Sequence, residues 1–293
     1  MRLQFSIGIT SNPRTWPIID GQIKPDGIDF VPTVLHPSEL FWRQLRFAEF
    51  DVAEMSMSSL MMAKSKGDER FVGIPVFTTR LFFHTTTLVR RGAKIDSPAD
   101  LKGKRVGVRA YSVTTAAWVR GVLQNDYGVD LDEINWVTFE DAHVAEYSDP
   151  PTAVRAPAGK SIVQMLIDGE IDAGVVGGPD LKDTRFQPVI ENPNNAAQHW
   201  CNKHSALPIN HMLVVKESLA NAHPFALQEV FRLLRESKLA MPRAEAGLDT
   251  LQFGLANIRR SLELIISYST QQGLIPEQIS VDDLFDEVTG NLV

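Results

Sequence analysis

The chain has 293 residues, too many for one small core, and a typical domain size of roughly 150 residues predicts two lobes. A net charge of −7 without long basic runs argues against nucleic acid as a partner. Cys201 is the only cysteine, which excludes an intrachain disulfide and a zinc site made of several thiolates.

The distribution of apolar residues predicts where the protein resides. No segment approaches the ~18 consecutive apolar residues of a membrane span, so we expect no membrane partner. The first ten residues have an alternating apolar pattern that Gln4 and Ser6 interrupt, which is typical of a first strand and not of a secretion signal. Unless a leader has been removed, we expect a cytoplasmic protein.

The N-terminal third alternates strands and helices. Residues 3–10 have the pattern of a strand, residues 11–15 that of a loop, and residues 28–35 that of a second strand. Ser38 is placed to cap a helix that runs to about Phe50. A short strand then ends near Met55, and another helix follows it.

Three serines mark the start of that helix, which must begin at one of Ser56, Ser58 or Ser59. Hydroxyls and free backbone N–H groups at a helix N-terminus suit a carboxylate ligand. Simple capping is the alternative, and it accounts for one serine better than for three.

Residues 77–89 are rich in β-branched and aromatic side chains and predict a strand. Arg80 and His84 are four residues apart, which would place them on the same face of an extended chain. A buried cation and a buried imidazole need an anionic or hydrogen-bonding partner, and a cleft is where such a partner can bind. An edge strand with both groups in water is the alternative.

A second junction at which a strand runs into a helix through hydroxyl-bearing residues follows. Residues 96–103 predict a one-turn helix with a glycine stop, and residues 104–108 predict a parallel strand. A helix then runs to about Asn125 and ends near Gly128. Hydroxyl-bearing residues precede or open it, and they suggest a second anion-binding helix N-terminus: Tyr111, Ser112, Thr114 and Thr115.

The rest of the chain continues the alternation. The segment that predicts a strand from residue 202 to 215 carries His211, and helices are expected from Pro224, over residues 248–273 and over 281–284. Residues 140–160, with several prolines and glycines, predict a long loop. Strand–helix alternation throughout favours a parallel-rich α/β protein with ligands at the carboxyl ends of strands.

With Ser-Pro-Ala-Asp-Leu-Lys-Gly-Lys-Arg-Val-Gly-Val opening the second lobe, this order of elements resembles the type II periplasmic binding proteins. The resemblance implies an α/β, two-lobed fold with a ligand cleft between lobes joined by two strand crossings. The crossings would fall near residues 84–90 and 208–214, and each contains a histidine. Lobe 1 would then be discontinuous, with residues 1–86 and 210–293, and lobe 2 would span residues 87–209.

More narrowly, the chain resembles the 4,5-dihydroxyphthalate decarboxylases, which have this fold without a secretion signal. The matching motifs cover most of the chain, more loosely after about residue 140. They are Arg14-Thr15, residues 17–21, 47–59 and 73–77, Arg80, His84, Tyr111, Thr114, and residues 118–121, 126–129 and 207–211.

Some positions depart from the family's pattern. Phe83 stands where arginine is expected just before the histidine, and Arg109, Ala110 and Ser112 stand in a turn that tends to read Pro-Glu-Tyr-Gln. These changes alter the charge expected at the ligand site. They affect the identity of the substrate more than the type of reaction.

The resemblance implies a decarboxylase for a small hydroxylated aromatic dicarboxylate, most simply 4,5-dihydroxyphthalate giving 3,4-dihydroxybenzoate and CO2, as in phthalate degradation. Such chemistry needs no redox cofactor and no metal if a ring hydroxyl para to the leaving carboxylate releases electrons into the ring. We expect Arg80 and Arg14 to grip the other carboxylate, with Arg109 as a third cation. The oxyanion contacts would come from Ser56, Ser58, Tyr111, Ser112 and Thr114 with the two helix N-termini.

Histidine suits the proton transfers because its ordinary pKa is about 6.5. His84 and His211 are therefore the candidates for the acid at the ring carbon and the base at the ring hydroxyl, in either order, and Glu54 could orient one imidazole. Both histidines could instead be structural. Glu54 with both histidines could also ligate a metal, although no His-x-x-x-His spacing supports it.

The main alternative is a non-catalytic solute-binding protein of the same fold that captures a small anion. A regulatory or biosynthetic relative with another small ligand is a third. The sequence leaves homo-oligomerisation open. Trp16, Phe82 and Trp118 could sandwich an aromatic ring, although core packing is the simpler interpretation.

Overall fold

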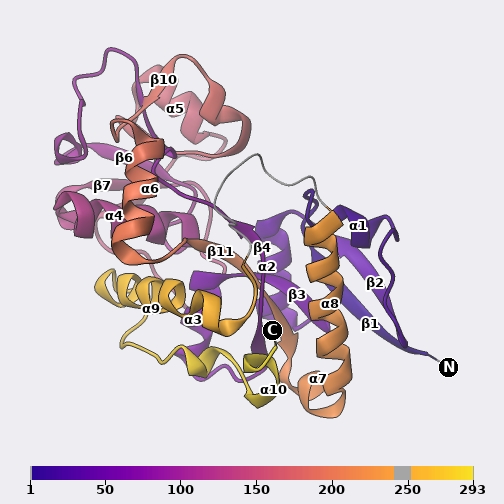
Figure 1. Ribbon diagram of the computed structural model, residues 1–293. Helices are drawn as coiled ribbons and strands as arrows, with labels where there is room; N and C mark the ends of the chain where they lie inside the picture. Colours follow the sequence, from indigo (N-terminus) through magenta and orange to yellow (C-terminus); the bar gives the residue numbers. More distant parts are fainter. Residues whose placement is uncertain (1, 241–251, 293) are drawn as a thin grey trace. The chain divides into compact units, whose positions relative to one another are not determined.

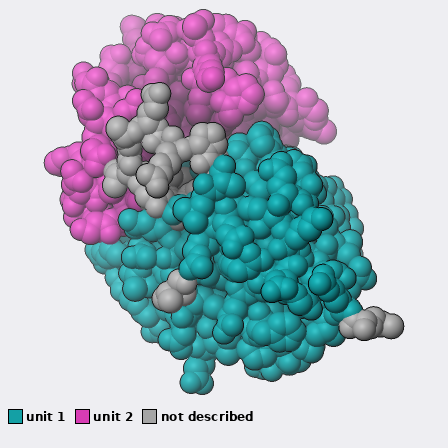
Figure 2. Space-filling view, turned by 45° about the vertical axis from the view of Figure 1, so that its right-hand side comes forward, with its two compact units in different colours: residues 1–81, 209–266, 275–293 teal, residues 82–208, 267–274 magenta. Residues whose placement is uncertain are grey.

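The computed structural model describes residues 2–240 and 252–292, which divide into two compact units (Figures 1 and 2). Unit 1 contains the described residues of 1–81, 209–266 and 275–293, and unit 2 contains residues 82–208 and 267–274. The lobes expected from the sequence divide after residues 86 and 209. The units differ from them in residues 82–86, in Ile209 and in residues 267–274.

Unit 1 is built on a five-stranded sheet in the order β2-β1-β3-β11-β4. Its strands are β1 (Leu3–Ile9), β2 (Ile28–Val34), β3 (Val52–Ser56), β4 (Phe71–Arg80) and β11 (Ile209–Lys216). β1 pairs in parallel with β2 and with β3, whereas β11 runs antiparallel between β3 and β4. A late strand therefore returns to the interior of a sheet formed by the first 80 residues.

The helices of unit 1 pack around this sheet. They are α1 (Trp16–Ile19), α2 (Pro37–Phe47), α3 (Met57–Lys64), α7 (Glu217–Ala222), α8 (Pro224–Ala240), the first part of α9 (Leu255–Gln271), the 3-10 turn η4 (Asp282–Leu284) and α10 (Glu287–Gly290). α8 has an apolar face at helical spacing, with Leu227, Val230 and Leu234 buried in the same core as residues of β1, β3, β4 and β11.

Unit 2 contains a six-stranded sheet in the order β10-β5-β9-β6-β7-β8. The strands are β5 (Thr87–Arg90), β6 (Arg105–Val108), β7 (Asn135–Thr138), β8 (Ala153–Arg155), β9 (Ala173–Val175) and β10 (Phe186–Pro188). β6 pairs in parallel with β7 and β9, and β5 pairs antiparallel with β9 and β10. The helices are α4 (Thr114–Tyr127), α5 (Ile162–Asp168) and α6 (Pro193–His204), with 3-10 turns η1 (Pro98–Leu101), η2 (Leu131–Glu133) and η3 (Gly178–Lys182).

The single strand expected over residues 77–89 is wrong. β4 ends at Arg80, β5 begins at Thr87, and the residues between them turn. The backbone N–H and the hydroxyl of Thr86 both donate to the carbonyl of Phe83, at 3.1 Å and 2.7 Å, which closes the turn. Arg80 and His84 therefore do not share one face of a strand, because β-branched residues such as Thr86 also form turns when their hydroxyls bind the backbone.

Four other expectations differ from the structure. Ser38 lies inside α2, whose N-cap is His36 and which ends at Phe47 rather than near Phe50. Residues 202–204 belong to α6, which the sequence analysis missed, and the strand begins only at Ile209. The loop over residues 140–160 contains the short strand β8. The expected helix over residues 248–273 is α9, which begins at Leu255, and residues 248–251 lie outside the described residues. No helix within residues 2–240 or 252–292 is both long enough and apolar enough to cross a bilayer.

The core of unit 2 depends on a close approach between α4 and Tyr268. Trp118 is fully buried, and its ring meets Trp200 and Tyr268 edge-on, with centroids 5.9 Å and 5.7 Å away. The ring of Tyr268 lies directly on Gly121, where an added Cβ would come within 1.9 Å of its Cδ2 atom. Only glycine fits at residue 121 without displacing that ring.

We predict that Gly121→Ala lowers the thermal unfolding midpoint by roughly 5–10 °C, because overpacking outweighs the better helix propensity of alanine. Differential scanning calorimetry measures the change. Gly177→Ala is the control, since Gly177 lies in the same unit with no atom within 4 Å of an added Cβ and no positive φ. Equal midpoints for the two variants would contradict the packing argument.

Candidate functional site

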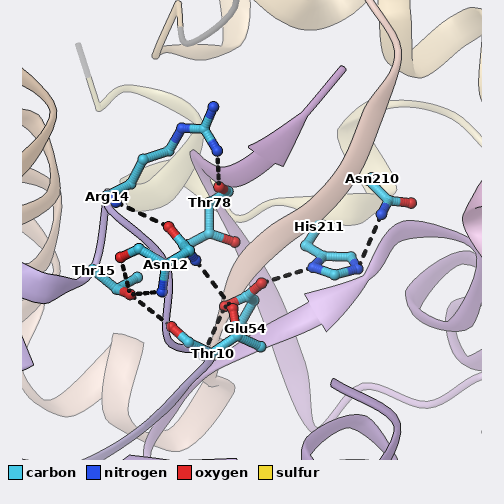
Figure 3. A network of polar contacts seen from close by, with 8 residues as sticks. All are labelled: Thr10, Asn12, Arg14, Thr15, Glu54, Thr78, Asn210 and His211. Carbon is cyan, nitrogen blue, oxygen red and sulfur yellow. Dashed lines mark hydrogen bonds and ion pairs between the residues drawn. The ribbon is translucent and has the colours of Figure 1, made fainter. Parts of the chain in front are cut away.

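The site in unit 1 is centred on Glu54, a fully buried carboxylate on β3. Its Oε2 accepts hydrogen bonds from the backbone N–H and the hydroxyl of Thr10, at 3.0 Å and 2.7 Å. Its Oε1 lies 2.7 Å from Nδ1 of His211 on β11 (Figure 3). Both oxygens are therefore used within the protein, which a buried carboxylate requires.

The charge of Glu54 follows from these contacts. Burial alone would raise the pKa of Glu54, but the hydrogen bond and charge of His211 and the hydrogen bond of Thr10 outweigh it, so that this pKa lies below its ordinary value. Glu54 is therefore ionised at neutral pH. An ionised carboxylate can only accept, so Nδ1 of His211 carries the hydrogen and its Nε2 is the nitrogen that exchanges protons.

Two irregularities in the pairing of β11 with β4 shape the site. Ile209 lies opposite Arg80 and His211 lies opposite Thr79, so that Asn210 is an extra residue in β11. The next pair is Met212 with Phe77, which leaves Thr78 extra in β4. Such β-bulges redirect side chains and release backbone groups from the ladder, and they are frequent beside active sites.

Arg14 uses one of the released groups. Its Nη1 donates to the carbonyl of Thr78 at 3.1 Å (Figure 3), while its Nε is buried and has no hydrogen-bond partner among the described residues. No carboxylate forms an ion pair with Arg14 within the described part of the chain, although the charge of Glu54 acts to raise the pKa of Arg14. Burial lowers the pKa of Arg14, but an arginine remains cationic at neutral pH. This cation is available for an anionic ligand.

The segment that carries Arg14 is held by a small polar network. Asn12 accepts from the backbone N–H of Arg14 at 3.0 Å and donates through Nδ2 to the hydroxyl of Thr10 at 3.2 Å. The hydroxyl of Thr15 donates to the carbonyl of Thr10 at 2.6 Å and accepts from the N–H of Asn12 at 3.1 Å. The loop after β1 thus fixes Arg14 and Glu54 in one network (Figure 3).

Ser56 and Ser58 lie at the junction of β3 and α3, as expected from the sequence. Both are buried, and their hydroxyl oxygens are 3.3 Å apart. Ser56 is the N-cap residue of α3, but its side chain makes no capping hydrogen bond. Simple capping by the side chain of Ser56 therefore does not explain its presence. Ser56 also pairs with His211 across the sheet, which places it beside the imidazole.

His84 lies in unit 2, in the turn that precedes β5. Its ring is buried, and its Nδ1 has no hydrogen-bond partner in the described residues. The rings of His84 and Trp200 pack edge to face, with their centroids 5.9 Å apart. Burial lowers the pKa of His84 to about 4, so that it is neutral at pH 7. It lines a pocket of about 220 Å³ with Asp126, Tyr127, Ala196, His199, Trp200 and Lys203.

The remaining candidates in unit 2 gather before and at the start of α4. Arg109 forms an ion pair with Glu140 at 3.4 Å. The ring of Tyr111 lies 3.7 Å beneath the guanidinium of the fully buried Arg120, which gives Tyr111 a packing function. Ser112 and Thr114 are buried hydroxyls at this helix start. These four residues share unit 2 with His84, whereas Arg14, Glu54, Ser56, Ser58 and His211 share unit 1.

Arg80 is the last residue of β4, and its side chain lies outside the described residues. No three histidine, cysteine, aspartate or glutamate residues are grouped to hold a metal ion in residues 2–240 and 252–292. Thr10, Asn12, Thr78 and Asn210 also belong to the network around Glu54 and were not among the site residues expected from the sequence. The carboxyl end of β1 beside the Asn-Pro turn was a signal for Thr10 and Asn12, but no periodicity reveals a bulge.

A family model described as "ABC transporter, phosphonate, periplasmic substrate-binding protein" matches residues 27–257. Among solved structures, the alkanesulfonate-binding protein SsuA from Xanthomonas axonopodis pv. citri aligns with TM-score 0.66 at 14% identity, covering 97% of this chain and 98% of that one. The desulfurization enzyme DSZB aligns with TM-score 0.62 at 15% identity, covering 99% and 98%. At such identities these likenesses show the fold alone, which is that of the type II periplasmic binding proteins.

Curated relatives are far more similar in sequence. The 4,5-dihydroxyphthalate decarboxylase of Comamonas testosteroni is 37% identical over 97% of this chain and 96% of its own length. The protein of the same name from Pseudomonas putida is 32% identical over 68% of this chain and 81% of its own. The chain therefore belongs to the periplasmic substrate-binding protein family that the model describes and, within it, to the 4,5-dihydroxyphthalate decarboxylases.

Proposed function

We propose that this protein removes one carboxylate from 4,5-dihydroxyphthalate, giving 3,4-dihydroxybenzoate and CO2 without a cofactor. The observation that carries the proposal is the buried pair of Glu54 and His211 in the same network as a cation, Arg14, that has no carboxylate partner among the described residues. A dianionic aromatic acid needs such a cation, and its decarboxylation needs a group that moves protons near neutral pH.

Arg14 is suited to hold the carboxylate that stays on the ring. Its Nη1 is fixed by the carbonyl of Thr78, and its remaining N–H groups can grip a carboxylate through parallel hydrogen bonds. Ser56 ends β3 and Ser58 lies in the first turn of α3, and their hydroxyls would add contacts to the ligand's oxygens. The substrate would thus be oriented before any bond breaks.

His211 is suited to the ring hydroxyl. Neutral His211 has its lone pair on Nε2, takes the proton of the hydroxyl para to the leaving carboxylate, and becomes an imidazolium that Glu54 stabilises. The electrons released into the ring favour protonation of the carbon that bears the leaving group. The C–C bond then breaks, its electron pair restores the aromatic ring, CO2 departs, and His211 returns its proton to the oxygen.

His84 remains the candidate for the acid at the ring carbon. Its neutral form cannot donate a proton as an imidazolium, but a carboxylate bound beside it would favour protonation. Its pocket is lined by the aromatic rings of Tyr127 and Trp200 and by Lys203, which forms an ion pair with Asp126 at 2.7 Å, so the aromatic rings are what would contact a small aromatic ligand there. The family model's description is also compatible with the rival proposal, a binding protein that captures an anion without converting it. A protein that only captures an anion would not need a histidine and a carboxylate arranged for proton transfer, as His211 and Glu54 are.

Product formation separates these two functions. We predict that the wild-type protein releases CO2 and 3,4-dihydroxybenzoate from 4,5-dihydroxyphthalate, and that His211→Gln lowers kcat by about 100-fold or more. Liquid chromatography of the product provides the rate. His36→Gln should keep the wild-type rate, since His36 is exposed at the start of α2 and makes no capping bond. Tight binding without product would instead identify a binding protein.

We predict that Arg14→Ala raises KM by roughly 10- to 100-fold with a smaller change in kcat, because it removes charge-assisted hydrogen bonds to the carboxylate that stays bound. Initial-rate kinetics across substrate concentration measure both constants. Arg259→Ala is the matched control in the same unit, where Arg259 pairs with Asp282 at the surface. An unchanged KM in Arg14→Ala would remove Arg14 from the substrate contacts.

The lowered pKa of Glu54 also predicts a pH-dependent contribution to stability. A depressed carboxyl pKa stabilises the fold fully above the unfolded-state value of about 4.3, and this contribution is lost as the pH falls through the folded-state value. Glu54→Gln should therefore unfold at a lower temperature than the wild type at pH 7, and the difference should shrink toward pH 3. Exposed Glu277 provides the control substitution, Glu277→Gln. A gap that widened in acid would contradict this assignment.

A further inference from the structure

Asn210 owes its position to the bulge in β11. In a regular strand, neighbouring side chains point to opposite faces, so Asn210 and His211 would point apart. Because Asn210 is the extra residue between the pairs Ile209–Arg80 and His211–Thr79, the alternation is interrupted there. Its Nδ2 lies 3.2 Å from Nε2 of His211, as Figure 3 shows.

The direction of this hydrogen bond follows from Glu54 at the other side of the ring. Ionised Glu54 accepts from Nδ1, so the lone pair of neutral His211 is on Nε2. The side-chain amide N–H of Asn210 therefore donates to Nε2. Figure 3 shows the resulting chain, in which Thr10 donates to Glu54, His211 donates to Glu54, and Asn210 donates to His211.

The two neighbours of His211 act on its protonation in opposite directions. A donor at Nε2 needs the lone pair and thus favours the neutral ring, whereas the carboxylate at Nδ1 favours the cation. Glu54 on β3 is the titratable group in contact with the ring among the described residues, and Arg14 acts through Glu54. α2 presents the ring of Phe41, whose centroid is 4.8 Å away. The charged Arg43 of α2 and Lys64 of α3 pair with glutamates instead.

We propose that Asn210 is a positioning residue that keeps His211 neutral and its Nε2 aimed for proton transfer, and that it gives up this nitrogen to the ring hydroxyl of the substrate. This inference rests on the proposed function, because it assigns Asn210 a part in the same proton transfer. On binding, the substrate O–H replaces the amide N–H at Nε2. The O–H bond then breaks, its electron pair stays on oxygen, and an Nε2–H bond forms.

The experiment compares Asn210→Ala and Asn210→Asp with the wild type. Removing the donor makes protonation of Nε2 easier, so the acidic limb of kcat/KM against pH should move up by about 0.5–1 pH unit in Asn210→Ala. Asn210→Asp should move it further, because a carboxylate beside Nε2 favours the cation. Asn125→Ala is the control, since it removes amide hydrogen bonds to Gly121 and Gln271, remote in sequence from the site, and should leave the limb in place.

A structural role alone would lower stability or kcat without moving the limb in this order. An unmoved limb in Asn210→Ala, or a shift toward lower pH, overturns the proposal. The titration of His211 is also followed by NMR in the absence of substrate, with its signal assigned from His211→Gln. A graded shift there without any decarboxylation would support the control of His211 by Asn210 while refuting the proposed function, so the two failures are distinguishable.

Discussion

The buried negative charge of Glu54 is the constraint on which the arrangement of unit 1 depends. An ion without water is tolerated only where donors surround it, and the donors here come from Thr10 after β1 and from His211 on β11. β3 therefore has to lie between those two strands, which is the observed strand order. The contact that stabilises the carboxylate also fixes the tautomer of the imidazole.

The bulges explain how a regular sheet accommodates an irregular site. Pro75 lies within β4, where a proline cannot donate to the ladder, and the pairing with β11 skips this region. Further along, the carbonyl of Thr78 accepts from Arg14, and the side chain of Asn210 comes to the imidazole. Each of these two departures from the ladder adds a polar group to the network around Glu54 and His211. Irregular pairing thus allows polar groups from β4 and β11 to contact each other's neighbours and the loop after β1.

The junction of β3 and α3 at Ser56 and Ser58 could be predicted because a strand that ends in a helix has a recognisable pattern, and the contact between Glu54 and His211 agrees with the expectation that Glu54 orients an imidazole. The single strand expected to carry Arg80 and His84 was wrong, since a run of threonines and aromatics fits a strand and a hydrogen-bonded turn equally well. Asn210 was missed for another reason. A one-residue bulge leaves no trace in a period-two pattern, so the partner of His211 could be found only from the register.

The order of strands in unit 1 also bears on how the protein is made. β11 separates β4 from the rest of its sheet, and it is encoded after the whole continuous segment 82–208 of unit 2. During synthesis on the ribosome, the sheet begun by the first 80 residues therefore cannot be completed until β11 emerges, more than a hundred residues later. Until then β4 presents an unsatisfied edge that invites association with other nascent chains. The hydrogen-bonded pair of Glu54 and His211 is completed in the same step that removes this edge.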